Sequence, residues 1–590
     1  MQGSFIRPIN NPQTPPPMTK VLNFTHLLLL TALVGVFWGA LTKLNLPLAE
    51  WEHITLAAAE SWSKGINTPW IFDHPPLYPF FLTLVFKFTG PSQEVARSAN
   101  LLLVILTCIV LFHFTADIFE KDTALWSVIL YLLSAVCIQG IQLMDVADTS
   151  LLPLTFLLMA NYIKNNISDP GPRNTTILSF MIALSLWAKV TSTLAFLIAV
   201  LFSYFYMFFL RRKGDQNPPT PLNIAALVFG LILFLTTWTL VSILLWGNEA
   251  FFSVLKAPWT AIHGRVAKVS YLPKIYMTSF EMIRLLVWFS PYLILMWLGI
   301  SWRIFRTRPQ SNDNHQSLKI LIVCITIFYF FGNLIIGGTN WGYPRYHNAI
   351  LPFICLFTGN YISISINKFH KNMLREVLII ISLSVIITVY LLKDPLLFLN
   401  LRFKELLLHG DGIDHVVKNA IMTFLPFYGL PIALVCLWLS IFRMRSRNRI
   451  YAILLIVCTL STLLALDLQQ IFASYRTSNQ YGAVGKVEVL QKVRNHVRDG
   501  DYVFATPEFN YDLRDKKVSG IGWQIWKSKD IFYRLIESNT PQAIVAGLTV
   551  NTISQLKWLL SKDTQHFLSS DYDFITIGTY YLWLRTSTRN

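Results

Sequence analysis

Two carboxylates stand two residues apart in the segment Glu50-Trp51-Glu52, just after the first long apolar run of the chain. Acids at this spacing can bind a divalent cation, or one of them can take a proton from a hydroxyl group. A solvated acidic loop without chemistry is the alternative interpretation. Because charges at membrane depth are costly, ionisable residues at the ends of apolar runs are candidates for function.

A second polar group follows in the same connection, where Asp73 and His74 precede two prolines and Tyr78. The proline pair disfavours helix and holds Asp73 and His74 on extended backbone. The alternative for this part of the connection is a solvated acidic loop that ends at a proline stop.

Four further candidates lie near the ends of later apolar runs. Arg345 stands among aromatic residues and can grip a phosphate in a bidentate manner, and Lys189 lies in a turn between two runs. The alternative for both is a cation snorkelling beside an aromatic belt. Asp148 suits a capping role as well as a site role. His263 belongs to a mixture of basic and aromatic residues that suits a phosphate and a sugar, or a wet membrane interface.

The composition indicates the elements that must position these residues. Of the 590 residues, 54% are apolar and 14% are charged, whereas a soluble protein carries about a quarter charged residues. The mean hydropathy is +0.48. The net charge of +17 is concentrated in basic clusters at the ends of apolar runs, which is typical of cytoplasmic loops rather than of nucleic-acid binding. The six cysteines fall inside apolar runs, so no disulfide framework is predicted.

Hydropathy predicts about thirteen transmembrane helices. The predicted spans are 21–46, 97–118, 123–141, 149–163, 176–189, 191–210, 221–246, 286–304, 318–337, 348–366, 375–392, 422–442 and 450–466. Placing the Arg-rich connections inside makes residues 1–20 a cytoplasmic tail, residues 21–466 the membrane domain and residues 47–96 an outward loop, which carries the candidate catalytic acids. Residues 467–590 then form an extracytoplasmic domain.

The tail after residue 466 has a different pattern. It contains strand-like runs at 502–505 and 574–577, and helical patterns over 487–497 and around 553–560. The predicted fold is therefore an α-helical polytopic membrane protein with a C-terminal extracytoplasmic α/β domain.

The order of these motifs resembles the integral-membrane GT-C glycosyltransferases, in the branch of protein O-mannosyltransferase-like enzymes and the lipid A aminoarabinose transferase. The resemblance covers the whole length, and the run His-Pro-Pro-Leu-Tyr is its most specific part. The matching pieces, in chain order, are Glu50-Trp51-Glu52, a small-residue helix ending in Gly65, Asp73-His74-Pro75-Pro76-Leu77-Tyr78, Gly90 to Arg97, Asp148, Ala188-Lys189, and Arg345-Tyr346 ahead of Pro352.

This resemblance implies roles for the candidate residues. The first-loop acid is the base that activates the acceptor. Counting back from Gly65 assigns that role to Glu50, with Glu52 close enough to compete. This family usually has Asp at that position. The expected substrate-binding residues are Asp73, His74, Tyr78, Asp148, Lys189, Arg345 and Tyr346, and the expected ligands of a divalent metal are Asp73 and His263.

The implied reaction moves a sugar from a polyprenyl-phosphate donor to an acceptor hydroxyl at the extracytoplasmic face, with inversion of the anomeric carbon. The expected partners are the lipid-linked donor, a lipid, glycan or protein acceptor, and the bilayer of the plasma membrane, in a bacterium the inner membrane. No Gly-x-x-x-x-Gly-Lys run is found, so no nucleotide cofactor is expected, and no nucleic-acid partner either. The rival functions are a secondary transporter or lipid-linked sugar flippase, and a structural membrane protein whose tail binds a partner.

Overall fold

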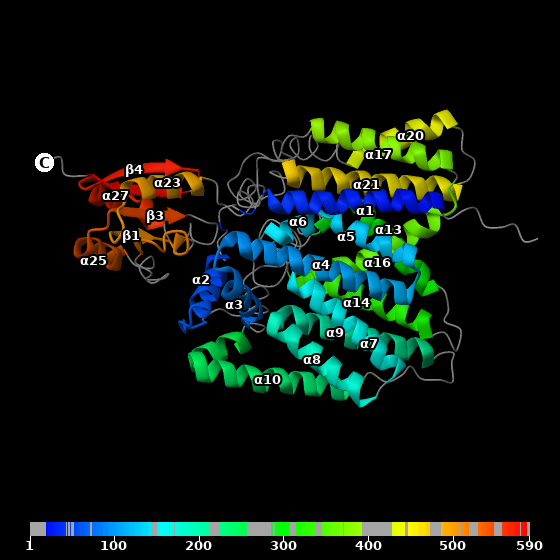
Figure 1. Ribbon diagram of the computed structural model, residues 1–590, viewed down its shortest axis with the longest axis horizontal. Helices are drawn as coiled ribbons and strands as arrows, with labels where there is room; N and C mark the ends of the chain where they lie inside the picture. The colour runs from blue at the N-terminus through cyan, green and yellow to red at the C-terminus, as the bar shows by residue number, and fades with distance from the viewer. Residues whose placement is uncertain are drawn as a thin grey trace, which may run out of the picture.

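The chain is mostly helical, with a small sheet near its C-terminal end (Figure 1). The computed structural model describes residues 19–42, 44, 48, 52–70, 74–142, 150–169, 171–212, 224–256, 282, 285–286, 289–306, 314–336, 345–369, 371–391, 428–442, 447–472, 485–506, 509–518, 529–547, 557–578 and 580–586.

Each of the thirteen predicted spans coincides with helix in the described residues. The helices that correspond to them are α1 (Thr19–Leu41), α4 (Gln93–Ile118), α5 (Lys121–Leu132) with α6 (Ala135–Gln142), α7 (Leu151–Ser168), α8 (Pro172–Ala188), α9 (Val190–Arg212), α10 (Ile224–Trp246), α13 (Pro291–Arg306), α14 (Asn314–Ile336), α16 (Leu351–Ile366), α17 (Lys371–Leu391), α20 (Leu430–Phe442) and α21 (Arg447–Phe472).

One predicted span is divided. The segment 123–141 contains two helices, because the chain turns at Leu133 and Ser134 and the Cys137 N–H then bonds to the Ser134 carbonyl (2.8 Å) to start α6. Local hydropathy cannot detect this break, since the turn residues are buried in the same way as the helix around them.

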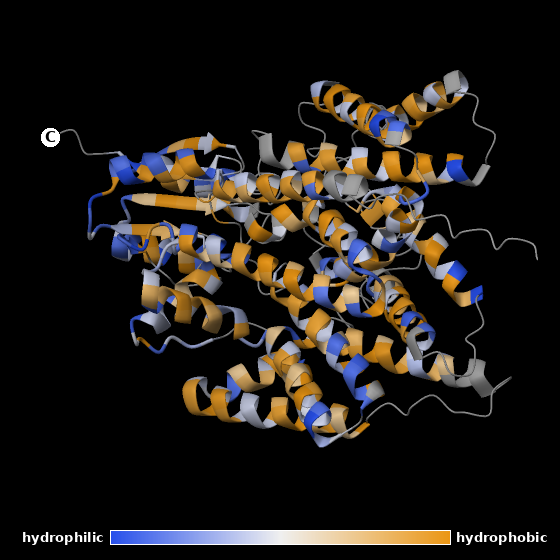
Figure 2. Ribbon diagram, turned by 45° about the vertical axis from the view of Figure 1, so that its right-hand side comes forward, coloured by the Kyte–Doolittle hydropathy of each residue, from blue (hydrophilic) through white to orange (hydrophobic). Residues whose placement is uncertain are grey.

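Six of the described helices are long and apolar enough to cross a membrane. Figure 2 shows apolar residues along most of the length of the bundle, including faces that no other helix covers. Leu244 of α10 is 77% exposed and Tyr390 of α17 is 81% exposed. Such faces need a hydrocarbon surrounding, so the chain is a multi-pass membrane protein.

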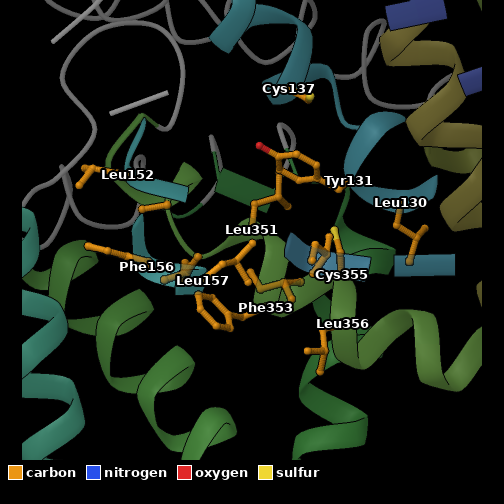
Figure 3. Close-up of a cluster of buried hydrophobic side chains, with 14 of the residues drawn as sticks. Leu130, Tyr131, Cys137, Leu152, Phe156, Leu157, Leu351, Phe353, Cys355 and Leu356 are labelled. Atoms are coloured by element: carbon orange, nitrogen blue, oxygen red, sulfur yellow. The ribbon is translucent and has the colours of Figure 1, made fainter. Parts of the chain in front are cut away.

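The centre of the bundle is closely packed where α5, α6, α7 and α16 meet (Figure 3). Small residues allow two of these helices to approach each other. A Cβ atom added at Gly359 of α16 would lie 2.6 Å from the hydroxyl of Ser127 on α5. In a membrane no hydrophobic effect drives helices together, so the close van der Waals packing that small residues allow stabilises such contacts.

The C-terminal part forms a five-stranded sheet with the order β2-β1-β3-β5-β4. The strands are β1 (Tyr502–Ala505), β2 (Lys517–Val518), β3 (Ala543–Gly547), β4 (Tyr572–Ile577) and β5 (Tyr580–Arg585). Strands β2, β1 and β3 are parallel, while β5 pairs antiparallel with both β3 and β4. This arrangement matches the predicted α/β character of the tail.

Helices cover both faces of this sheet because its central strands are apolar on both sides. Val503 and Val545 point to the face covered by α23 (Lys486–His496). Phe504 and Ile544 point to the other face, with α25 (Lys529–Asn539) and α27 (Lys562–Ser569). The domain lies at one end of the bundle, beside α2 (Glu52–Ser63) and α3 (Leu77–Thr89), which belong to the first predicted outward loop (Figure 1).

Candidate functional site

A buried ion pair lies where the first loop meets α4. Glu52 begins α2, and its side chain is 2% exposed. Its carboxylate lies 4.0 Å from a guanidinium nitrogen of Arg97, whose side chain is also 2% exposed. Arg97 stands one turn into α4, which is capped by the Ser92 hydroxyl accepting from the Val95 N–H (3.2 Å). The same guanidinium donates to the Leu44 carbonyl, so Arg97 joins the end of the first span to the start of α2.

A second polar contact joins α3, α4 and the start of α7. The Tyr78 hydroxyl donates to the side-chain oxygen of Asn100 (2.6 Å), and the Ser150 hydroxyl donates to the same oxygen (3.2 Å). The Asn100 amide donates in turn to the Ile141 carbonyl (3.3 Å). Tyr78 is 1% exposed. In these contacts Tyr78, a predicted substrate-binding residue, anchors the loop after the two prolines to the bundle.

An aromatic cluster holds the middle of the first loop against α10. The Trp62 ring stacks on the Trp246 ring, with centroids 5.4 Å apart, and the Trp246 indole donates to the Asn67 side chain (3.1 Å). Trp70 packs against Trp62 and donates its indole N–H to the His74 carbonyl (2.5 Å). The carbonyl of His74 is therefore held by Trp70, which itself packs against Trp62.

Two predicted residues from distant segments meet. Lys189, between α8 and α9, is 1% exposed. Its ammonium group lies 4.3 Å from the centre of the Tyr346 ring on α15 (Arg345–Asn348). The Tyr346 carbonyl accepts from the Tyr329 hydroxyl (3.0 Å) and so ties this ring to α14. A cation over an aromatic face in a buried place is a strong contact, and it keeps a positive charge at this end of the bundle.

The C-terminal domain contacts the first loop through a buried lysine. Lys486, the first residue of α23, is 0% exposed and donates to the carbonyl of Leu48 (3.0 Å). It also pairs with the Asp512 carboxylate at 2.8 Å and lies over the Phe509 ring. Leu48 precedes the Glu50-Trp51-Glu52 segment by two residues, so the domain holds the chain that leads into the acidic pair.

A second contact of the same domain reaches α2. Arg514 lies 3.4 Å from the Glu60 carboxylate, which also pairs with Lys64 at 2.5 Å. Tyr511 is 4% exposed and belongs to the core of the helical bundle rather than to that of its own domain. Burial raises the pKa of the Tyr511 hydroxyl to about 12, so the hydroxyl is neutral at physiological pH.

Several predicted residues lie outside the described residues. These are Glu50, Asp73, Asp148 and His263, together with the side chain of Arg345. Among the residues that the structure does describe, no group of three or more His, Cys, Asp or Glu side chains is close enough to hold a metal ion. The metal predicted at Asp73 and His263 thus stays a prediction.

Two residues of this region, Arg97 and Lys486, were not assigned a role from the sequence. Arg97 is a charge inside a predicted span, which is by itself a reason to suspect function. Lys486 gave no such signal, because it starts an ordinary polar helix and its partner Leu48 is 438 residues away. The tail carried no residue predicted to act in the site, yet it supplies Lys486, Asp512 and Arg514 to the surroundings of the first loop.

Comparison with known proteins shows what this chain is similar to. Residues 73–240 match the family model of dolichyl-phosphate-mannose-protein mannosyltransferase. This match and the fold confirm the resemblance to the GT-C glycosyltransferases, and the chain is a multi-pass membrane protein of that fold. No curated protein matches the sequence.

Solved structures of ArnT from Cupriavidus metallidurans share the fold over almost the entire chain. The structure bound to undecaprenyl phosphate matches with a TM-score of 0.56 and 13% identity, covering 96% of this chain and 98% of that one. The apo structure matches with a TM-score of 0.56 and 15% identity, covering 95% and 98%.

Proposed function

We propose that the protein is a membrane glycosyltransferase that moves a sugar from a polyprenyl-phosphate donor to an acceptor hydroxyl. The observation that carries this proposal is the whole-length fold match to ArnT, of which one structure is bound to undecaprenyl phosphate. The mannosyltransferase family match over residues 73–240 supports it, because that stretch begins in the first loop and includes Tyr78, Arg97 and Lys189.

In this proposal Glu50 is the base that removes the acceptor proton, and Glu52 anchors the start of α2 to Arg97. The resemblance assigns the base to the position of Glu50. Glu52 is 2% exposed and its carboxylate faces Arg97, so an acceptor hydroxyl has little access to it. The Glu52–Arg97 pair instead fixes the start of α2, two residues after the proposed base.

In this proposal, cationic side chains compensate the negative charge that develops on the leaving phosphate. When the bond between the anomeric carbon and the phosphate oxygen breaks, the polyprenyl phosphate gains negative charge. Lys189 keeps its ammonium group beside Tyr346, and His74 is held at the end of the Trp70 contact. We assign these two residues, with Arg345, Asp73 and Asp148, to the phosphate and the sugar of the donor.

Attack of the acceptor oxygen on the face opposite the phosphate inverts the anomeric carbon in a single displacement. The proton of the acceptor hydroxyl moves to the Glu50 carboxylate, and the electron pair of the broken bond stays on the phosphate oxygen. A divalent metal held by Asp73 and His263 would add positive charge beside that phosphate. We place the reaction at the extracytoplasmic face of the plasma membrane, with the N-terminal tail in the cytoplasm.

The test is sugar transfer from radiolabelled polyprenyl-phosphate sugars by the purified protein in lipid nanodiscs. We expect transfer by the wild type, none by Glu50→Gln, and an inverted product detected by NMR. Movement of the labelled lipid from one leaflet of a liposome membrane to the other, without any sugar transfer, would instead favour a flippase. The Lys529→Gln variant is the matched control, since Lys529 pairs with Asp563 on the exposed surface of the C-terminal domain.

A further inference from the structure

A polar cavity lies between the C-terminal domain and the first turn of α4. Its volume is about 370 Å³, which is within the range of small-molecule sites. The described residues that line it include Gln93 of α4, Gln491, Arg494 and Asn495 of α23, and Asp512. Two segments that are about 400 residues apart along the chain thus form one binding surface.

The lining has the chemistry of a neutral, hydroxyl-rich ligand. Side-chain amides both donate and accept, as hydroxyl groups do. Gln491 and Asn495 are exposed and Gln93 is half-buried, and all three line the cavity, so a ligand there can reach their side-chain amides. Among the described lining residues Arg494 is positive and Asp512 is negative, so the lining carries no net charge, and Arg494 also donates to the Asp512 carbonyl (2.8 Å). A phosphate would require an excess of positive charge, which these residues do not provide.

The cavity is connected to the first loop. Gln93 lies one turn before Arg97 on α4, and Asp512 is close enough to Arg97 for their charges to interact. The Lys486 ammonium group bonds on one side to Asp512, a wall of the cavity, and on the other to the carbonyl of Leu48. A ligand in the cavity therefore lies beside the contact that holds the segment leading into Glu50.

We propose that this cavity binds a sugar residue of the acceptor. The inference rests on the proposed function, because it assigns the cavity to one substrate of that reaction. Lys189 and His74, which we assign to the donor, are not among the described lining residues. The membrane-side wall is the outer turn of α4, so a group bound here lies beyond the span, next to the first loop. The substrate class that follows is a carbohydrate acceptor, such as a glycan or the sugar of a glycolipid.

The first experiment measures binding without any donor. Saturation-transfer NMR on the full chain in nanodiscs would detect the binding of two neutral probes, methyl α-mannoside and methyl β-glucoside. Inorganic phosphate is the anionic probe, and its binding would be detected by whether it displaces a bound glycoside. We expect binding of a glycoside that is weakened about tenfold by the Gln491→Ala/Asn495→Ala double change, since each lost amide removes hydrogen bonds. Both residues are exposed, so the fold should be unaffected. Glu488→Ala is the matched control, because Glu488 is exposed on the same helix and does not line the cavity.

Glycoside binding that is equal in the wild type and the double variant would overturn the proposal, as would displacement of the glycoside by phosphate. A second readout separates this proposal from the reaction itself. In the transfer assay, the double variant should raise the KM for the acceptor and leave the KM for the polyprenyl-phosphate donor unchanged. If no donor supports transfer while the glycoside binds in the cavity, the proposed reaction fails and the carbohydrate site stands.

Discussion

Changing Glu52 to Gln tests whether this acid is an anchor or the base. The substitution keeps the shape of the side chain and removes the charge that faces Arg97. A carboxylate oxygen of Glu52 lies 4.0 Å from a guanidinium nitrogen of Arg97. At this distance the attraction between two unit charges is about 4 kcal/mol at an effective dielectric constant near 20. Measured losses on breaking buried pairs are about 3–5 kcal/mol. Arg97 keeps its bond to the Leu44 carbonyl, so we expect a loss near the lower end, about 3 kcal/mol.

The assay is the free energy of unfolding of the purified protein in mixed micelles titrated with SDS, measured beside sugar transfer. Glu52→Gln should lower both stability and transfer. Glu50→Gln should abolish transfer and leave the unfolding free energy within about 1 kcal/mol of the wild type, because the substitution keeps the size and shape of the side chain.

A double variant isolates the pair. Glu52→Gln/Arg97→Gln removes both charges, so no uncompensated buried cation remains, and part of the stability lost in the single variant should return. If Glu52→Gln unfolds like the wild type but transfers no sugar, Glu52 is the base rather than an anchor, and its contact with Arg97 contributes little to stability.

Three further outcomes are expected. Lys486→Met removes the buried cation that joins the C-terminal domain to Leu48 and should cost about 3–5 kcal/mol, seen as faster proteolysis between the two parts. Lys529→Met, at an exposed pair, should leave the rate of proteolysis unchanged. Lys189→Gln should raise the KM for the donor about tenfold, as measured by initial rates. Tyr346→Leu should raise this KM less, because the ring only supports the ammonium group of Lys189. Because burial raises the pKa of Tyr511 from 10.0 to about 12, its contribution to stability is full below pH 10.0 and is lost as the pH rises to about 12; Tyr511→Phe should flatten this part of the unfolding curve against pH.

The helices were predictable because their signal is local. A run such as Ile224–Trp246 is apolar on every side, and only a membrane makes such a helix stable in isolation from its neighbours. The strand Tyr502–Ala505 was predictable for a similar reason, since its residues favour strand and the polar residues around it end the pattern. The break after Leu132 was not predictable, because it depends on how α5 and α6 pack within the bundle.

The site was only partly predictable. The sequence identified Lys189 and Tyr346 as candidates, and the structure brings the two side chains together. The sequence did not predict that Glu52 faces Arg97, because the pairing depends on the angle at which α2 leaves the first span. Contacts between distant parts of a chain are set by the packing of whole elements, and hydropathy carries no information about which element a polar end will meet.

The contact between the C-terminal domain and the first loop relies on charges, although apolar contacts are the cheaper way to join two surfaces. Replacing a buried ion pair by apolar residues is often neutral or stabilising, so stability alone does not explain the contact of Lys486 with Asp512 and Leu48. A directional contact fixes which atoms meet, whereas apolar surfaces can slide against each other. In this chain the fixed atom is a backbone carbonyl two residues before Glu50. The same domain therefore contacts the residue that precedes the proposed base by two positions and supplies most of the lining of the cavity proposed for the acceptor.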